Sequence, residues 1–323
     1  MVDKVVKMIS ERGINLHIHP VMKKIGNDIS KTYELYDSDE QVIFRSKENC
    51  QWTYNCFNLM DYLATQLKRN FDTMCMNQYG KILTINDPEL KVMCPLLTNP
   101  NRIIDMNKAY FEGYDNDGFG DEFSYYSGKL KIRIIDIFNS KKVLKSNYQK
   151  ILPTIKMASE FKFQTIYKFG SLKDGKLSFN TYYANPEYDT LFNIDISDDN
   201  KSCTFIFDTM LSQLFFHNIM VGAYSYIHPK AELLSPTANV FYRKKILPYH
   251  NIKFKMNIYQ IAETLNLSTN RKYVLQKTID KIITELVDLN LIKSFSKSNQ
   301  EYTFSSSRPK NKVCIFPRKA VAS

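Results

Sequence analysis

The stretch NRKYVLQKTIDKIITELVDLNLIKSFSKSNQEYTF, residues 270–304, decides the fold of the C-terminal part of the chain. Its apolar residues lie alternately four and three positions apart, at Leu275, Ile279, Ile282, Leu286 and Leu289. This spacing predicts a long helix, from Arg271 to about Leu289, that buries one face. The residues after it alternate between apolar and polar around a polar turn at 297–300, which predicts two strands joined as a hairpin.

A second, shorter helix is predicted just before this stretch, over residues 258–267 (IYQIAETLNL). Ser268, Thr269 and Asn270 follow it and are residues typical of helix caps. The order helix, turn, helix, hairpin is that of a winged-helix domain. We therefore predict a winged-helix DNA-binding domain over residues 234–305, followed by a basic tail at 306–323.

The net charge of the chain, +11, comes entirely from its last quarter. Residues 240–323 contain 16 Lys and Arg against 5 Asp and Glu, whereas the first 239 residues contain 28 of each sign. A cationic excess confined to one module indicates a surface that meets a polyanion. The charge therefore predicts the kind of partner rather than the fold.

The face of the long helix opposite its apolar stripe is polar and basic. A recognition helix places its N-terminal residues nearest the bases, where Asn and Gln suit adenine, and Arg and Lys suit guanine or phosphates. The predicted DNA-binding residues lie on the helix, the hairpin and the tail: Asn270, Arg271, Lys272, Tyr273, Gln276, Lys277, Lys281, Lys293, Lys297, Arg308 and Lys310. The alternative is an ordinary solvated helix face, which the same residue types also populate.

The first two thirds of the chain are less regular in pattern. An aromatic, alternating stretch interrupted by Asp174 and Gly175 predicts a β-hairpin. Helices are predicted over residues 2–13, 58–69, 130–157, 209–223 and 235–246, and short strands over 41–46 and 80–87. The Gly- and Asp-rich segment 112–122 predicts a boundary that ends an N-terminal region of unknown role, residues 1–112.

Motifs for common enzymes and metal sites are absent from the sequence: it has no P-loop, G-x-S-x-G, H-E-x-x-H or G-x-G-x-x-G. The six widely spaced cysteines are typical of free thiols in a cytoplasmic protein. The start of the chain lacks the apolar core of a signal peptide, and the most apolar stretch, residues 214–227, is too short to cross a bilayer. We expect no catalysis, no cofactor, no metal and no membrane association.

One enzymatic alternative remains open. His17 and His19 would point to the same face of a strand, an arrangement with which HUH-type nicking initiators hold a divalent metal. Tyr126 and Tyr242 each begin a Y-x-x-K pattern that could supply the nucleophile. Metal-dependent cleavage lost in His17→Ala would support this alternative.

Three segments between residues 160 and 304 carry a resemblance to a known family. They are the aromatic hairpin FQTIYKFGSLKDGKLSFNTYYANPEY, then LSPTANVFYRKK with Ala238 and Tyr242, and NRKYVLQKTIDKIITELVDLNLIKSF with Tyr273 near its start. Together they resemble the plasmid replication initiators built from two winged-helix domains. The resemblance implies an α+β fold with tandem winged-helix-like domains, the first over residues 123–228, and an additional N-terminal region.

The resemblance also implies a function, the initiation of plasmid or mobile-element replication without catalysis. Such a protein binds origin repeats in double-stranded DNA through its C-terminal winged helix, recruits the host replicative helicase and can form a homodimer. A winged-helix transcriptional regulator is the main alternative, because it would share the same DNA-binding surface. An adaptor that uses its winged helix to bind protein is a third class.

Overall fold

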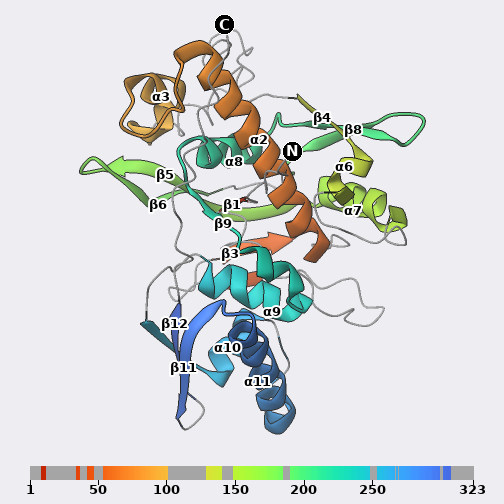
Figure 1. Cartoon of the computed structure of the whole chain (residues 1–323), viewed down its shortest axis with the longest axis vertical. Helices are drawn as coiled ribbons and strands as arrows, with labels where there is room; N and C mark the ends of the chain where they lie inside the picture. Colours follow the sequence, from red (N-terminus) through yellow and green to blue (C-terminus); the bar gives the residue numbers. More distant parts are fainter. Residues whose placement is uncertain are drawn as a thin grey trace, which may run out of the picture. The chain divides into compact units, whose positions relative to one another are not determined.

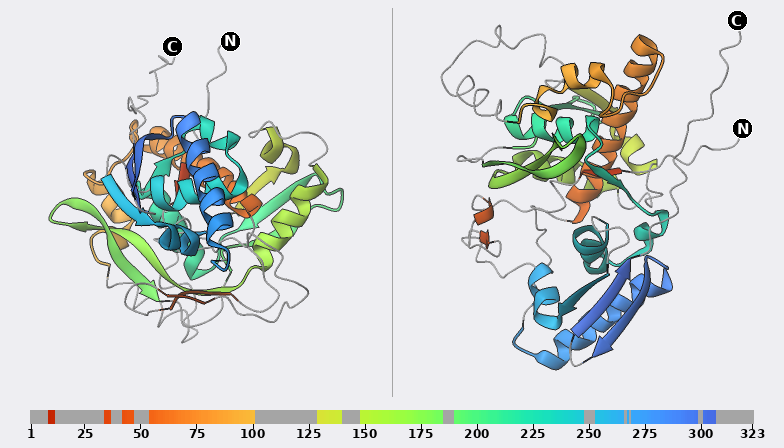
Figure 2. Two further views of the ribbon diagram at one scale, coloured as in Figure 1. Left: turned by 90° about the horizontal axis from the view of Figure 1, so that it is seen from below. Right: turned by 90° about the vertical axis from the view of Figure 1, so that its left-hand side faces the viewer.

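The computed structural model of the chain describes residues 9–11, 34–36, 42–46, 54–100, 129–139, 148–184, 190–247, 253–265, 267, 269–298 and 301–306. The chain divides into two compact units, Met1–Ile227 and His228–Ser323, and each is described by itself (Figures 1 and 2). Both units combine helices with small antiparallel sheets, so the fold is of the α+β class.

The helices of the first unit gather around one hydrophobic core. They are α2 (Tyr54–Tyr79), α3 (Pro88–Met93), α6 (Ile134–Asn139), α7 (Tyr148–Glu160) and α8 (Met210–Met220), with a 3₁₀ turn, η1, at Pro95–Leu97. The long helix α2 packs against α7 and α8. Buried residues from residues 54–100 and from residues 129–223 belong to the same core. The boundary predicted at 112–122 lies outside the described residues, but the segments on its two sides share this core.

The strands of the first unit form three antiparallel sheets. One has the order β2 (Glu34–Tyr36), β3 (Val42–Ser46), β5 (Phe163–Lys173), β6 (Lys176–Ala184). A second has the order β4 (Lys129–Arg133), β8 (Ser202–Ile206), β7 (Asn193–Ile196). The third pairs β1 (Ile9–Glu11) with β9 (Tyr224–Tyr226).

The hairpin predicted at Asp174 and Gly175 is confirmed. It joins β5 to β6 with Lys173 opposite Lys176. Asp174 has φ of 52° and Gly175 has φ of 70°, the left-handed conformation that a two-residue type I′ turn requires at both positions. The predicted helices within α2, around α8 and at α9, and the predicted strand at β3, are also confirmed.

Three local predictions in the first unit are wrong. Ile9–Glu11 is strand β1 rather than helix, because it pairs with β9 across the unit. Lys129–Arg133 is strand β4, in which Leu130 and Ile132 point inward and alternate with exposed residues. Residues 80–87 form a turn: Gly80, with φ of 67°, follows the end of α2, and Asp87 accepts the Thr84 N–H at 2.7 Å.

The second unit runs through helix, strand, helix, helix, strand, strand. Its elements are a 3₁₀ turn η4 (Pro229–Leu233), α9 (Pro236–Phe241), a π-helical turn η5 (Tyr242–Ile246), β10 (Lys253–Asn257), α10 (Ile258–Thr264), α11 (Lys272–Asp288), β11 (Ile292–Ser298) and β12 (Glu301–Ser306). The three strands form one antiparallel sheet in the order β10-β12-β11. Figure 2 shows α11 lying along one face of this sheet.

Apolar packing between α11 and the sheet holds this unit together. The predicted stripe is buried at Leu275, Ile279, Ile282 and Leu286, and Ile283 joins it. On the sheet, the ring of Phe304 stacks on Phe254 at a centroid distance of 5.1 Å and lies 6.0 Å from the ring of Tyr302. Burial of this face fixes which side of α11 is left for solvent.

Caps define where the helices of this unit begin. Asn257 ends β10 and forms a capping box with Gln260 at the start of α10. Ser235 precedes Pro236, the first residue of α9, and the Ser235 N–H donates to the Glu285 carboxylate of α11 at 2.9 Å. The hydrogen bond from Ser235 to Glu285 joins the start of α9 to α11, the helix on which the candidate site lies.

Candidate nucleic-acid interface

The predicted DNA-binding residues of the helix lie on the solvent-exposed side of α11. Six of them are exposed: Asn270, Arg271, Lys272, Tyr273, Lys277 and Lys281. Arg271 is the N-cap residue of α11, in an extended conformation with φ of −126°. Lys272 and Tyr273 therefore stand in the first helical turn.

Each of the next turns of α11 also exposes a predicted site residue on this face. Tyr273, Lys277 and Lys281 are four residues apart and lie above one another on the same face. Thr284 continues the face and is also exposed. With 17 residues, α11 is about 25 Å long at 1.5 Å per residue. The exposed face is thus long enough to follow a groove of duplex DNA for several base pairs.

The first turn of α11 is favourable for an anion. It contains no acidic residue, and the unpaired backbone N–H groups of a helix start carry partial positive charge. Arg271 and Lys272 add two full charges at the same end. Positive charge therefore gathers at the start of α11.

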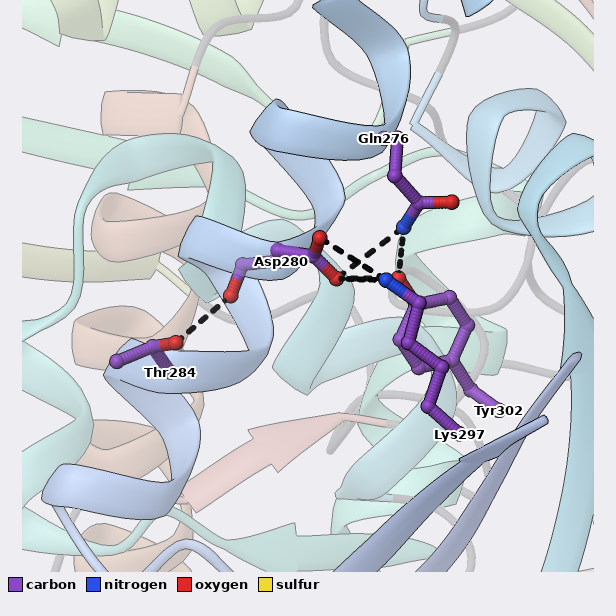
Figure 3. A network of polar contacts seen from close by, with 5 residues as sticks. All are labelled: Gln276, Asp280, Thr284, Lys297 and Tyr302. Atoms are coloured by element: carbon purple, nitrogen blue, oxygen red, sulfur yellow. Dashed lines mark hydrogen bonds and ion pairs between the residues drawn. The ribbon is translucent and has the colours of Figure 1, made fainter. Parts of the chain in front are cut away.

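A polar network joins the middle of α11 to the hairpin of β11 and β12, and Asp280 is its centre (Figure 3). The Tyr302 hydroxyl donates to the Asp280 carboxylate, and Lys297 contacts both carboxylate oxygens at 3.1 Å. Gln276 Nε2 donates to Asp280 at 3.1 Å and also to the Tyr302 hydroxyl oxygen. Thr284 Oγ1 donates to the backbone carbonyl of Asp280 at 2.9 Å.

The network fixes the charge state of its members. Burial alone would raise the pKa of the Asp280 carboxyl, but hydrogen bonds from Tyr302 and Lys297 outweigh burial and hold this pKa below its usual value. Burial, and then the neighbouring carboxylate, raise the pKa of the Tyr302 hydroxyl well above its usual value. The Lys297 ammonium also lies over the Tyr302 ring, 5.4 Å from the centroid. Asp280 is thus an anion and Tyr302 a neutral donor at physiological pH.

Two predicted site residues are members of this network. Gln276 and Lys297 both contact the Asp280 carboxylate. Sequence reasoning did not find Asp280 or Tyr302. The spacing of four residues between Gln276 and Asp280 was a usable signal, but Tyr302 lies 22 residues further on and reaches Asp280 through the tertiary fold.

The remaining predicted site residues lie outside the described part of the chain. Lys293 belongs to strand β11, but its side chain is not among the described ones, and Arg308 and Lys310 follow the last described residue. Their assignment to DNA binding stays a prediction.

Not all of the cationic excess lies on the surface. Arg243 and Lys244 in the π-helical turn are buried, and the Arg243 Nε–H donates to Asn239 Oδ1 at 2.6 Å. Burial, and then the nearby charge of Lys245, lower the pKa of Lys244. Arg243 and Lys244 therefore add nothing to the basic surface of this unit, whereas Arg271, Lys272, Lys277 and Lys281 are exposed.

The residues of the nicking alternative are not brought together in the described part of the chain. His17, His19 and Tyr126 lie outside it. Tyr242 is buried in the π-helical turn, where its hydroxyl oxygen accepts the His228 N–H at 3.3 Å. Within the described ranges, no group of three or more potential ligands could hold a metal ion. None of the described helices is long and apolar enough to span a bilayer.

Comparison with known proteins leaves the family open. No family model and no curated protein matches the sequence. Among solved structures, a crystal structure of the RctB domains 2-3, RctB-155-483, matches 92% of this chain and 97% of its own at 11% identity and a TM-score of 0.41. A selenomethionine derivative of RctB domains 2 and 3 matches 91% of this chain and 96% of its own at 10% identity and a TM-score of 0.42.

Proposed function

We propose that this protein binds double-stranded DNA sequence-specifically and initiates the replication of a plasmid or mobile element, acting in the cytoplasm and without catalysis. The observation that carries the proposal is the exposed, basic face of α11 in the unit that holds the entire net charge of the chain. A face of this length and sign matches the phosphate-lined groove of a duplex.

The second unit would bind as a winged helix. Its order α9, β10, α10, α11, β11, β12 and its sheet order β10-β12-β11 are consistent with that domain type. In this assignment α11 is the recognition helix and the β11–β12 hairpin is the wing. The recognition helix enters the major groove with its first turn nearest the base edges.

Phosphate contacts would supply most of the affinity. Lys277 and Lys281 follow the first turn along the exposed face and would meet the backbone of one strand. Each phosphate neutralised by a cation releases counterions, so the affinity should fall steeply with salt concentration. Sequence preference would come from the residues at the start of α11.

The role as an initiator rests on the resemblance described above, with origin repeats, a homodimer and a host replicative helicase as the implied partners. A transcriptional regulator would use the same face of α11. Repeated sites in the footprint, each bound by one winged helix, support the initiator, whereas a single operator-like site supports the regulator.

The proposal is tested by titrating the full-length protein against its own upstream DNA and against random duplex over a range of salt concentrations. We expect tighter binding to the upstream DNA, a steep salt slope and intact strands when magnesium is added. Lys277→Ala should weaken binding to both duplexes equally, and Lys156→Ala, an exposed residue of α7, is the matched control. Weak binding to both duplexes at low salt would refute the proposal, and a nick that appears only with metal would favour the nicking enzyme.

A further inference from the structure

The first turn of α11 exposes two apolar side chains between its cations. Tyr273 has 79% of its surface exposed and Val274 has 53%. Lys272 precedes them and Lys277 follows one turn later, both exposed. The buried stripe of α11 is complete without Tyr273 and Val274, so neither is needed for the core of the unit. Their position instead suits a partner that presents an apolar group to Tyr273 and Val274 and anionic groups to the cations around them.

The polar network competes with a base for the Gln276 amide. Bidentate pairing with adenine needs an amide N–H for the base, and Gln276 Nε2 donates to Asp280 and contacts the Tyr302 hydroxyl. The orientation of the amide follows from its partner, because an ionised carboxylate only accepts hydrogen bonds. The base-reading role therefore moves from Gln276 to its neighbours in the first turn.

Thymine offers the apolar contact that these neighbours need. In the major groove the base edges present donors and acceptors, and thymine adds its 5-methyl group. We infer that Tyr273 and Val274 contact thymine 5-methyl groups, so that the binding site contains A·T pairs where the first turn of α11 enters the groove. This inference rests on the proposed function. Arg271, Lys272 and Lys277 surround the two side chains and would hold the flanking phosphates.

Replacing thymine with uracil tests the inference without changing the protein. Duplexes that the full-length chain prefers are first selected from a randomised pool, and the best is resynthesised with deoxyuridine for thymidine. Uracil pairs with adenine as thymine does and lacks only the 5-methyl group. The affinity should fall about fourfold for each methyl group that is contacted. Uracil placed at one position at a time locates those methyl groups.

Two variants distinguish loss of the methyl contact from a general loss of DNA affinity. Val274→Ser should bind the thymine duplex more weakly than the wild type but bind the uracil duplex equally well, because the methyl contact is already lost. Lys281→Ala should weaken binding to both duplexes by the same factor. Equal affinity of the wild type for thymine and uracil duplexes would overturn the inference and leave the proposed function standing. No preference for the selected duplex over random DNA would overturn both.

Discussion

The Tyr302 hydroxyl donates a hydrogen bond of 2.5 Å to the Asp280 carboxylate, and so joins strand β12 to the middle of α11. Tyr302 is buried and its ring stacks beside Phe304, so the hydroxyl has little freedom to leave. Lys297 reaches the same carboxylate from β11. One anion on the helix therefore binds both strands of the hairpin, in addition to the apolar packing between α11 and the sheet.

Removing the Tyr302 hydroxyl tests how much this junction contributes to stability. Tyr302→Phe keeps the buried ring but removes both the donor to Asp280 and the acceptor for Gln276. We expect the free energy of unfolding to fall by about 1 kcal/mol, because Asp280 is partly exposed and can recruit water. Urea unfolding followed by circular dichroism measures the change. An unchanged midpoint would mean that the hydroxyl contributes nothing, and Tyr259→Phe, an exposed ring on α10, is the control.

Neutralising Asp280 should strengthen DNA binding if α11 is the recognition helix. Asp280→Asn removes a negative charge from the helix and releases Lys297 to meet a phosphate. We expect a dissociation constant several-fold lower at low salt, and a salt slope steeper by about one counterion. Fluorescence anisotropy at several salt concentrations measures both. Asp198→Asn makes the same charge change on an exposed turn of the first unit and should leave affinity unchanged; weaker binding by Asp280→Asn would contradict the expectation.

The second unit could be predicted from sequence because its main elements have strong local periodicity. The predicted helix, from Arg271 to about Leu289, agrees with α11 within a residue at each end. Strand β10 was missed, since it has five residues, mostly polar or charged, and is a strand because it pairs with β12 almost fifty residues later. In the first unit, Ile9–Glu11 was assigned to a helix for the same reason, because only its long-range pairing with β9 makes it a strand.

In the candidate site, too, the residues that follow from the local helix pattern could be predicted, and those that depend on the tertiary fold could not. Exposed residues of α11 could be predicted, since a helical wheel needs only the buried stripe to place the opposite face. The role of Gln276 could not, because its partner Tyr302 lies 26 residues away and meets it only after the hairpin packs on α11.

His217 should make the stability of the first unit depend on pH. The ring is fully buried on α8, its Nε2 contacts the Gly170 carbonyl at 2.6 Å, and burial lowers its pKa to about 4. The unfolded chain takes up a proton near pH 6.5, whereas the folded chain does so only near pH 4, so stability falls as pH decreases through this window. We expect a loss of roughly 2 kcal/mol between pH 7 and pH 5. Unfolding curves at the two pH values measure it.

A variant without the titrating ring separates the pH dependence due to His217 from that due to carboxylates and other histidines. His217→Gln retains an N–H that can donate to the Gly170 carbonyl and does not take up a proton. It should be less stable than the wild type at pH 7 but lose less stability between pH 7 and pH 5. If both proteins lose the same amount, His217 is not the group responsible.

A side chain at Gly170 should destabilise the first unit, because strand β5 passes close to α8 at this residue. Its N–H donates to Asn218 Oδ1 at 2.9 Å, and an added Cβ would lie 2.9 Å from Val221 Cγ2 and 3.0 Å from Leu177 Cδ1. Gly170→Ala should therefore lower the free energy of unfolding by about 2 kcal/mol, as overpacking of a dense core does. Val221→Ala removes the nearest obstacle, so the double variant should be more stable than the sum of the two single losses predicts. Chemical denaturation of all four proteins completes this cycle, and strictly additive losses would show that the close contact with Val221 is not the cause.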